Sequence, residues 1–222
     1  MKNNKILIID CGSQYTQLIA RRVRELGVYS EILFWDSPAD KLNASNPAGI
    51  IISGGPRSVL DDDAPFVPRE ILKSGVPVLG ICYGMQMLAH ILGGAVERGE
   101  SAEYGRASVN VEGGFLFKHC AGDAKLEVWM SHWDEVKKIP DGFRVTARSE
   151  SGALAGFESA DGSVTALQFH PEVAHTPKGM EILRAFVFDI CGCKADWTLG
   201  TEWIEHDIVK IRAKVGNGTV IC

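Results

Sequence analysis

The chain contains no apolar run longer than a single strand requires, and this absence removes several classes of protein. A helix that spans a bilayer needs about 20 consecutive apolar residues. The run nearest the amino terminus, Ile6 to Ile9, is far shorter, and it is also too short for the hydrophobic region of a secretory signal. We therefore expect a cytoplasmic protein without membrane contact.

The six cysteines lack the regular spacing of a disulfide framework. Their irregular scatter is typical of a reducing compartment. Cys191 and Cys193 are the only close pair, whereas a zinc site usually needs a second pair at similar spacing. We expect these two cysteines to be structural, and we predict no metal site.

A surplus of positive charge is also absent. The formal net charge is −5, which argues against a general nucleic-acid surface. With 222 residues, of which 45% are hydrophobic, the chain can bury one substantial core with some residues left over. These values predict one domain and a short appendage.

Apolar runs alternate with helical patterns in the first part of the chain. Strands are predicted at Lys5 to Asp10, Glu31 to Trp35, Gly49 to Ser53 and Val76 to Ile81. Continuous β-branched runs such as Ile50 to Ile52 are typical of strands buried on both faces. Alternation with helices predicts an α/β fold: an open, mostly parallel sheet with helices on both faces.

Shorter strands joined by glycine and aspartate turns follow between Arg106 and Phe157. They are predicted at 108–111, 126–130, 143–147 and 153–157. This pattern indicates a small antiparallel addition at one edge of the sheet. Gly179 to Ile190 then shows the periodicity of one amphipathic helix.

The pentapeptide from Gly80 to Gly84 follows a predicted strand and precedes a predicted helix. Glycine on both sides permits a sharp turn in which the neighbouring chain comes too close for a Cβ atom. Such a turn presents Cys82 at the start of a helix, where unsatisfied N–H groups favour a thiolate. Cys82 is the predicted nucleophile.

A partner for this nucleophile follows the alternating run from Val164 to Phe169. A cysteine nucleophile needs a histidine to carry its proton, and the histidine needs a carboxylate to orient it. His170 and Glu172 fit these roles, because residues two apart on an extended segment point to one side. Pro171 disfavours a helix between them. The predicted catalytic triad is Cys82, His170 and Glu172.

The glycine pair within Ser53 to Pro56 lies at the end of a buried strand, the edge where ligands bind in an open parallel sheet. The Lys-Ser/Thr pair of a phosphate-binding P-loop is missing. We predict instead an oxyanion hole formed by the N–H groups of Gly55 and Tyr83. A plain tight turn is the alternative.

Together these motifs resemble the class I glutamine amidotransferases, and they occur in the order found in that family. The resemblance covers roughly the first 190 residues. It is strongest toward the amidotransferase domains of GMP synthases, through Asp10 to Glu25, Trp129 to His132 and Gln168 to Thr176. It implies a flavodoxin-like sheet and hydrolysis of glutamine to glutamate. It also implies a partner synthetase that uses the ammonia and ATP to aminate XMP to GMP.

The resemblance implies further site residues. Gln86 and the segment Ser131, His132 and Trp133 match positions that hold the backbone groups of glutamine in the family. The alternative for Ser131 and His132 is an ordered loop without a binding role. Trp133 stands where the family has a small residue such as glycine, so its indole must line the pocket or turn into solvent. No cofactor is implied here, since ATP and magnesium would serve only the synthetase.

The chain lacks the Ser-Gly-Gly-x-Asp-Ser loop with which the ATP pyrophosphatase domain of those synthases begins. We interpret residues 1–195 as the amidotransferase domain. We interpret residues 196–222 as the start of a truncated synthetase domain or as a docking element for a separate synthetase subunit. This tail has a helical pattern with an apolar face, formed by Ile204, Ile208, Ile211 and Val215, and a strand-like end, Thr219 to Cys222. Such a face could also form a homodimer.

Other functions stay open at this point. A related cysteine hydrolase could use the same elbow, and it would differ by lacking glutaminase activity. A regulatory module without catalysis would be expected to lack Cys82 or His170, and both are present. Amidotransferases of other pathways are nearer alternatives, and the stretch from Ser13 to Gln17 argues against them.

Overall fold

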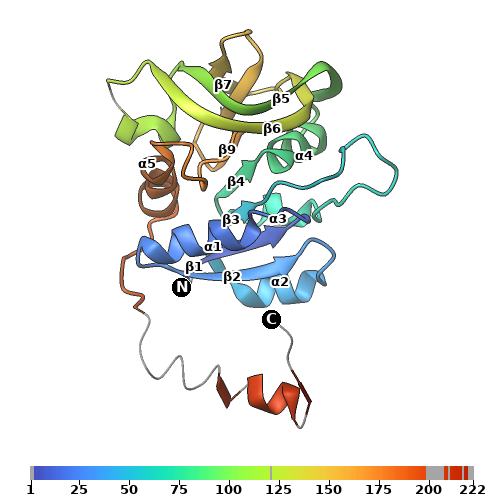
Figure 1. The fold of residues 1–222 in the computed structure, drawn as a ribbon, viewed down its shortest axis with the longest axis vertical. Helices are drawn as coiled ribbons and strands as arrows, with labels where there is room; N and C mark the ends of the chain where they lie inside the picture. Colours follow the sequence, from blue (N-terminus) through green and yellow to red (C-terminus); the bar gives the residue numbers. More distant parts are fainter. Residues whose placement is uncertain (1–2, 121, 199–207, 210, 217, 220–222) are drawn as a thin grey trace.

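One nine-stranded sheet forms the centre of the molecule, with the strand order β2-β1-β3-β4-β9-β8-β7-β5-β6 (Figure 1). The computed structural model describes the whole chain except residues 1–2, 121, 199–207, 210, 217 and 220–222. The parallel strands are β1 (Asn3–Asp10), β2 (Tyr29–Phe34), β3 (Pro47–Ile52), β4 (Val78–Ile81) and β9 (Val164–Leu167). The antiparallel strands are β5 (Ala95–Val111), β6 (Lys125–Lys138), β7 (Phe143–Ser149) and β8 (Leu154–Ser159). The predicted mostly parallel sheet with an antiparallel part is confirmed.

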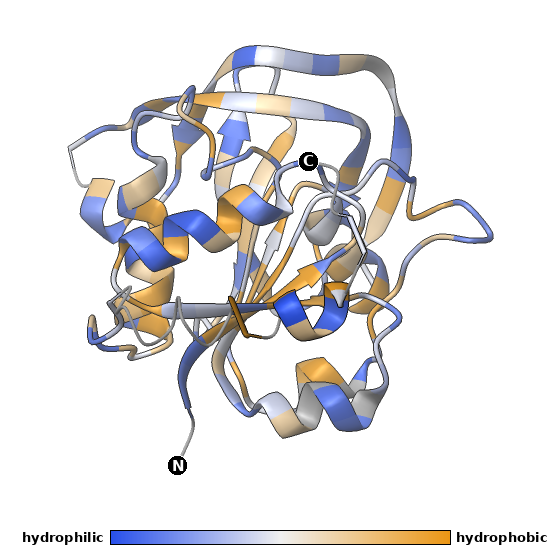
Figure 2. Cartoon of the chain, turned by 60° about the horizontal axis from the view of Figure 1, so that its bottom comes forward, coloured by the Kyte–Doolittle hydropathy of each residue, from blue (hydrophilic) through white to orange (hydrophobic). Residues whose placement is uncertain are grey.

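Helices cover both faces of the sheet, as predicted. Side chains alternate along β1, so Ile6 and Ile8 face one layer while Leu7 and Ile9 face the other. The first layer contains α1 (Thr16–Glu25), η1 (Phe115–Cys120), α5 (Gly179–Arg184) and η2 (Ala185–Ile190). The second layer contains α3 (Glu70–Lys73) and α4 (Tyr83–Ile91); α2 (Ala39–Ser45) follows β2. Figure 2 shows the hydrophobic colour concentrated on the central strands and on the inner sides of the helices.

The antiparallel strands β5 and β6 extend well beyond their predicted bounds. β5 begins at Ala95 rather than Ser108, and β6 continues to Lys138 rather than ending at Met130. Alternate residues of β6 are buried while those between them are more exposed, and polar residues occur on both faces, including the buried His132 and Asp134. This polarity hides the strands from a search for apolar runs. The segment from Ser131 to Trp133 therefore lies in a strand, not in a loop.

The predicted helix from Gly179 to Ile190 consists of two kinds of helix. The α-helix α5 gives way at Ala185 to the π-helix η2, where the Cys191 N–H donates to the Phe186 carbonyl at 2.9 Å. The wider turn accommodates three successive buried residues, from Ala185 to Val187. The spacing of apolar residues in the sequence follows a single helical period, so it cannot indicate the change from an α-helix to a π-helix.

The carboxy-terminal segment has exposed apolar side chains where the structure describes it. Ile208, Val209 and Ile211 are helical and exposed. Ile204 and residues 220–222 of the predicted strand, Thr219 to Cys222, lie outside the described residues. The interpretation of this tail as the start of another domain, a docking element or a dimer contact stays a prediction.

In the described part of the chain, no helix has the length and apolar character to cross a membrane.

Candidate active site

Cys82 lies on a strained turn between β4 and α4. Its φ of 54° and ψ of −108° belong to a conformation that residues with a side chain rarely adopt. A Cβ atom on Gly80 would lie 2.5 Å from the Gly84 carbonyl oxygen, and one on Gly84 would lie 2.5 Å from the Ile52 carbonyl oxygen. Both glycines are required by the close approach of backbone, which is the geometry of a nucleophile elbow.

Gly84→Ala tests this packing. The added methyl group would push α4 away from β3, so we expect the free energy of unfolding to fall by about 1–3 kcal/mol. Urea denaturation measures the change. A loss below about 0.5 kcal/mol, the range of an ordinary surface substitution, would show that the turn can absorb a side chain.

Neighbouring strands bring Cys82 and His170 together. β4 and β9 run parallel with Ile81 opposite Leu167, and the Cys82 N–H donates to the Leu167 carbonyl at 2.7 Å. His170 follows shortly after this strand, and both side chains line one pocket. The Cys82 sulfur also lies 3.4 Å from the Ser131 carbonyl oxygen. The sheet itself therefore sets the distance between Cys82 and His170.

His170 is buried and held on several sides. Its Nδ1 lies 2.7 Å from Oε1 of Glu172, which is also buried. Its backbone N–H donates to the Trp129 carbonyl at 3.0 Å, and its carbonyl accepts from the Thr176 hydroxyl at 2.6 Å. The Tyr15 ring lies nearly perpendicular to the imidazole, with ring centres 5.0 Å apart. Nε2 is the ring nitrogen that does not face Glu172.

The charges around His170 raise its pKa. Burial alone would lower the pKa, but hydrogen bonds and electrostatic attraction to Cys82 and Glu172 outweigh burial and raise it to about 11. Oε2 of Glu172 is buried and has no hydrogen-bond partner among the described residues. A carboxylate in that position needs a nearby positive charge. The imidazolium is therefore the stable form at neutral pH.

The loop after β3 passes close to both catalytic candidates. A Cβ atom on Gly54 would lie 3.2 Å from Cε1 of His170 and 3.6 Å from Cβ of Cys82. One on Gly55 would lie 3.4 Å from Cγ of Tyr83, and both Gly55 and Tyr83 line the pocket beside the sulfur. Gly55 is required here, because a Cβ atom on it would also lie 2.7 Å from the Cys11 carbonyl oxygen. The predicted donation from the two N–H groups to an oxyanion stays a prediction.

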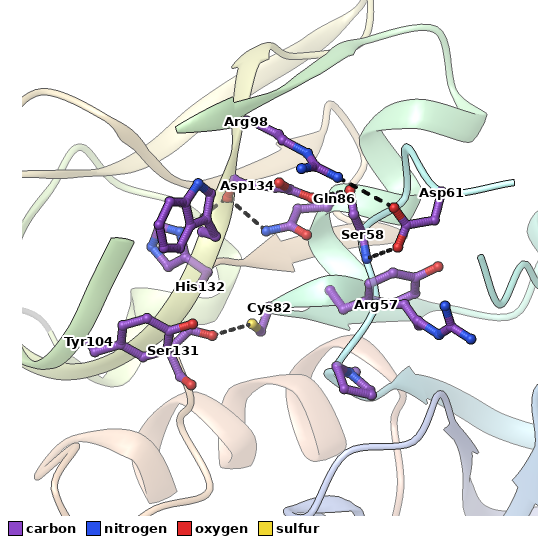
Figure 3. Close-up of a pocket in the computed structure, with 14 residues that line it drawn as sticks. Arg57, Ser58, Asp61, Cys82, Gln86, Arg98, Tyr104, Ser131, His132 and Asp134 are labelled. Atoms are coloured by element: carbon purple, nitrogen blue, oxygen red, sulfur yellow. Dashed lines mark hydrogen bonds and ion pairs between the residues drawn. The ribbon is translucent and has the colours of Figure 1, made fainter. Parts of the chain in front are cut away.

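A pocket of about 420 Å³ opens beside Cys82 (Figure 3). Every residue that the sequence analysis assigned to glutamine or to the oxyanion lines it: Gly55, Tyr83, Gln86, Ser131, His132 and Trp133. The wall also contains residues that the sequence analysis did not assign to the site: Pro56, Arg57, Ser58, Asp61, Arg98, Tyr104 and Asp134. Charges of both signs therefore face one cavity of small-molecule size.

Asp134 links the walls of this pocket. Its carbonyl accepts from Gln86 Nε2 at 2.9 Å and lies 3.1 Å from Nδ1 of His132, while its carboxylate accepts from the Ser58 hydroxyl (Figure 3). Nε2 of His132 lies 3.4 Å from Glu103 on the paired strand β5. Burial lowers the pKa of His132, and Glu103 opposes this effect. A polar network therefore fixes the wall opposite Cys82.

Trp133 meets both alternatives raised for its indole. It lines the pocket and is 54% exposed, and Tyr104, which lines the same pocket, is 68% exposed. The pairing of β5 with β6 shifts register between Arg98 and Glu103, opposite Trp133. Such irregularities redirect side chains near functional sites. The two aromatic rings form the outer rim of the pocket.

Cys191 and Cys193 lie beside the parallel half of the sheet, away from this pocket. A Cβ atom on Gly49 would lie 2.2 Å from the Cys191 sulfur, so this cysteine packs directly on β3. Burial raises the pKa of the Cys193 thiol to about 11. Both observations fit the structural role predicted for the pair. The described residues contain no cluster of three or more histidine, cysteine, aspartate or glutamate side chains that could hold a metal ion.

Known proteins are similar to this chain in sequence. The family model for class I glutamine amidotransferases matches residues 7–190. A GMP synthase (glutamine-hydrolysing) of Acetivibrio thermocellus is 47% identical over the whole chain, and one of Lactobacillus acidophilus is 48% identical over 98% of it. The chain spans only 43% and 42% of these two proteins.

A solved structure adds a relative of comparable length. It is a protein of Thermoplasma acidophilum that is provisionally described as one of the subunits of a GMP synthase. It is 30% identical, with a TM-score of 0.74, and the match covers 93% of this chain and 97% of that one. With the family model and the sequence relatives, it shows that this chain belongs to the class I glutamine amidotransferase family.

Proposed function

We propose that this chain hydrolyses glutamine to glutamate and ammonia with Cys82, His170 and Glu172. The observation that carries the proposal is the buried Nδ1 to Oε1 contact of 2.7 Å between His170 and Glu172, beside a cysteine on an elbow. Nucleophile, proton carrier and orienting carboxylate are thereby adjacent. The site needs no organic cofactor or metal for this reaction, because these three groups supply each chemical step.

In the first half of the reaction, the Cys82 thiolate attacks the side-chain amide carbon of glutamine. The N–H groups of Gly55 and Tyr83 stabilise the oxyanion of the tetrahedral intermediate. The His170 imidazolium donates its Nε2 proton to the amide nitrogen. The carbon–nitrogen bond breaks, ammonia leaves and a thioester with Cys82 remains.

In the second half, water attacks the thioester carbon while neutral His170 accepts a proton from the water. The new tetrahedral intermediate collapses and the carbon–sulfur bond breaks. Glutamate leaves, and the Cys82 thiolate and the His170 imidazolium are restored. Glu172 keeps Nδ1 protonated throughout, so that Nε2 is the nitrogen that exchanges protons.

The charges of the large pocket suit the two ends of a free amino acid. Arg57 and Arg98 can attract the carboxylate of glutamine, and the carboxylates of Asp61 and Asp134 can attract its ammonium group. Arg98 lies 3.6 Å from Asp61. The two arginines and the two aspartates together carry a net charge close to zero. A zwitterion can be bound there at little cost in net charge.

The ammonia has a proposed use. The matched sequence relatives, named GMP synthase (glutamine-hydrolysing), are more than twice as long as this chain. We therefore propose that the partner is a synthetase domain or a separate synthetase chain, which consumes the ammonia to aminate XMP to GMP. ATP and magnesium would be bound by that partner. The cytoplasm suits this reaction, because a reducing compartment keeps the Cys82 thiol free.

The test of this function is glutamate release from glutamine by the purified chain, with Cys82→Ala as the control. The assay is repeated with a GMP synthetase domain, XMP and ATP. Release that depends on Cys82, and that increases with the synthetase, supports both parts of the proposal. Release without such an increase would overturn the assigned partner, and no release in either assay would overturn the glutaminase.

Trp133→Gly tests the rim of the pocket. A half-exposed indole adds packing around the substrate but carries no reacting group, so we expect the KM for glutamine to increase about two- to five-fold with little change in kcat. Steady-state kinetics measure both constants. A fall in kcat with an unchanged KM would instead place the indole in the chemical step.

A further inference from the structure

The segment from Gly12 to Tyr15 forms one wall of a second pocket, which has a volume of about 350 Å³. Gly55, Pro56, Cys82 and Ser131 line both this pocket and the larger one. His170 lines the second pocket alone, whereas Gln86, His132 and Asp134 line only the first. The sulfur thus lies at the junction, with the imidazole on the side of the second pocket.

This segment is fixed at the carboxyl end of β1. The Asp10 carboxylate accepts from the Gly12 N–H at 2.9 Å and from the Thr16 hydroxyl at 2.8 Å. The Tyr15 N–H donates to the Ser13 hydroxyl oxygen at 3.1 Å. Tyr15 is therefore held by the hydrogen bond of its own N–H group and by those of Gly12 and Thr16 on either side of it. Its ring is presented to the pocket from a rigid support.

The Tyr15 ring contacts the one histidine that must keep a defined orientation. Its centre lies 5.0 Å from that of the His170 ring, at an interplanar angle of 70°. The hydrogen bond to Glu172 fixes Nδ1 but permits the imidazole to tilt about that contact. A perpendicular aromatic ring restricts the tilt and so keeps the imidazolium on its hydrogen bond to Glu172.

We propose that Tyr15 is a positioning residue, whose ring holds the His170 imidazolium in the plane that directs Nε2 at the Cys82 sulfur. This inference rests on the proposed glutaminase function. Tyr15 acts through the histidine, because its ring contacts the imidazole and it does not line the pocket that holds Gln86 and His132. The aromatic ring, not the hydroxyl group, carries the effect.

Three variants separate this role from simple packing. Tyr15→Leu removes the ring, and we expect kcat to fall about 10- to 100-fold with KM within about two-fold, because a small misplacement of a catalytic group is costly. Tyr15→Phe keeps the ring and should retain kcat within about three-fold. Tyr29→Leu is the matched control. Tyr29 lies on β2 and contacts Trp197 and Arg24, away from either pocket, so its variant should match wild type.

The pH profile of kcat is a measurement that would stay unchanged if Tyr15 served only to pack the fold. Without the ring, the imidazolium is less stable, so the pKa of His170 falls and the alkaline limb of kcat moves to lower pH. Because the imidazole is then held less firmly on Glu172, we expect a shift of about 0.5–1 pH unit in Tyr15→Leu and none in Tyr15→Phe. Circular dichroism checks that each variant is folded. Tyr15→Met, unbranched and also without a ring, replaces Tyr15→Leu if that protein does not fold.

A second measurement needs no glutamine. Iodoacetamide alkylation of Cys82, followed by mass spectrometry of its peptide across pH, reports the pairing of the thiolate with the imidazolium. Its pH profile should change in Tyr15→Leu and stay as wild type in Tyr15→Phe and Tyr29→Leu. If wild type releases no glutamate, the glutaminase fails and alkylation still decides the role of Tyr15. An active wild type with unchanged kinetics and alkylation in Tyr15→Leu would overturn the positioning role.

Discussion

Cys82→Ala is expected to reduce glutamate release by a factor on the order of 10⁴ or more, because alanine has no group that can form the thioester. The fold should persist, since the substitution removes one sulfur atom and adds no bulk. The measurement is single-turnover and steady-state glutamate release, with circular dichroism to confirm folding. Residual activity above about one percent of wild type would show that another group attacks glutamine.

Cys82→Gly is the matched variant for the strain at this position. Alanine retains the cost of a φ of 54°, whereas glycine adopts this conformation freely. We expect both variants to be inactive. The free energy of unfolding should be about 1 kcal/mol higher for Cys82→Gly than for Cys82→Ala. Equal values in urea denaturation would contradict the claim that the turn stores strain.

His170→Ala is expected to produce the second largest loss, on the order of 10³- to 10⁴-fold in kcat, because neither proton transfer has another donor. Glu172→Ala should cost less, about 10²-fold, since a carboxylate that orients the imidazole is less essential than the imidazole. Steady-state kinetics of the two variants provide the comparison. A larger loss in Glu172→Ala than in His170→Ala would reverse the assigned roles.

Glu172→Gln is expected to shift the pH profile of activity in a defined direction. The carboxylate stabilises the positively charged imidazolium, and together with Cys82 it raises the pKa of His170 to about 11. Glutamine still accepts the Nδ1 hydrogen bond but removes this negative charge, so the pKa of His170 falls back toward the usual 6.5. The proton for the leaving ammonia is then lost at lower pH. The alkaline limb of the activity profile should move to lower pH by at least about one unit.

The parts of this molecule that were predictable are those encoded locally. The elbow is visible in the sequence because the spacing of Gly80, Cys82 and Gly84 is dictated by close contacts of the turn itself. The buried parallel strands are visible because they are continuously apolar. His170 and Glu172 could be paired because two residues of one extended segment must point to the same side.

The residues that were missed depend on contacts between distant segments. Ser58 and Asp134 meet only after the loop that follows β3 folds against β6, and no local pattern relates them. Glu103 reaches His132 through the pairing of β5 with β6, strands whose polar faces conceal them. Tyr15 was visible as part of a family stretch, but its contact with His170 was not.

The connection between β4 and β9 has a consequence for how such proteins can diversify. These two strands are hydrogen-bonded neighbours, yet α4 and all four antiparallel strands are inserted in the chain between them. Because the parallel ladder anchors both ends, the insertion can change in length or composition without separating Cys82 from His170. The insertion also supplies His132, Trp133 and Asp134 to the pocket. Selection can therefore remodel what is recognised while the reacting pair is inherited intact.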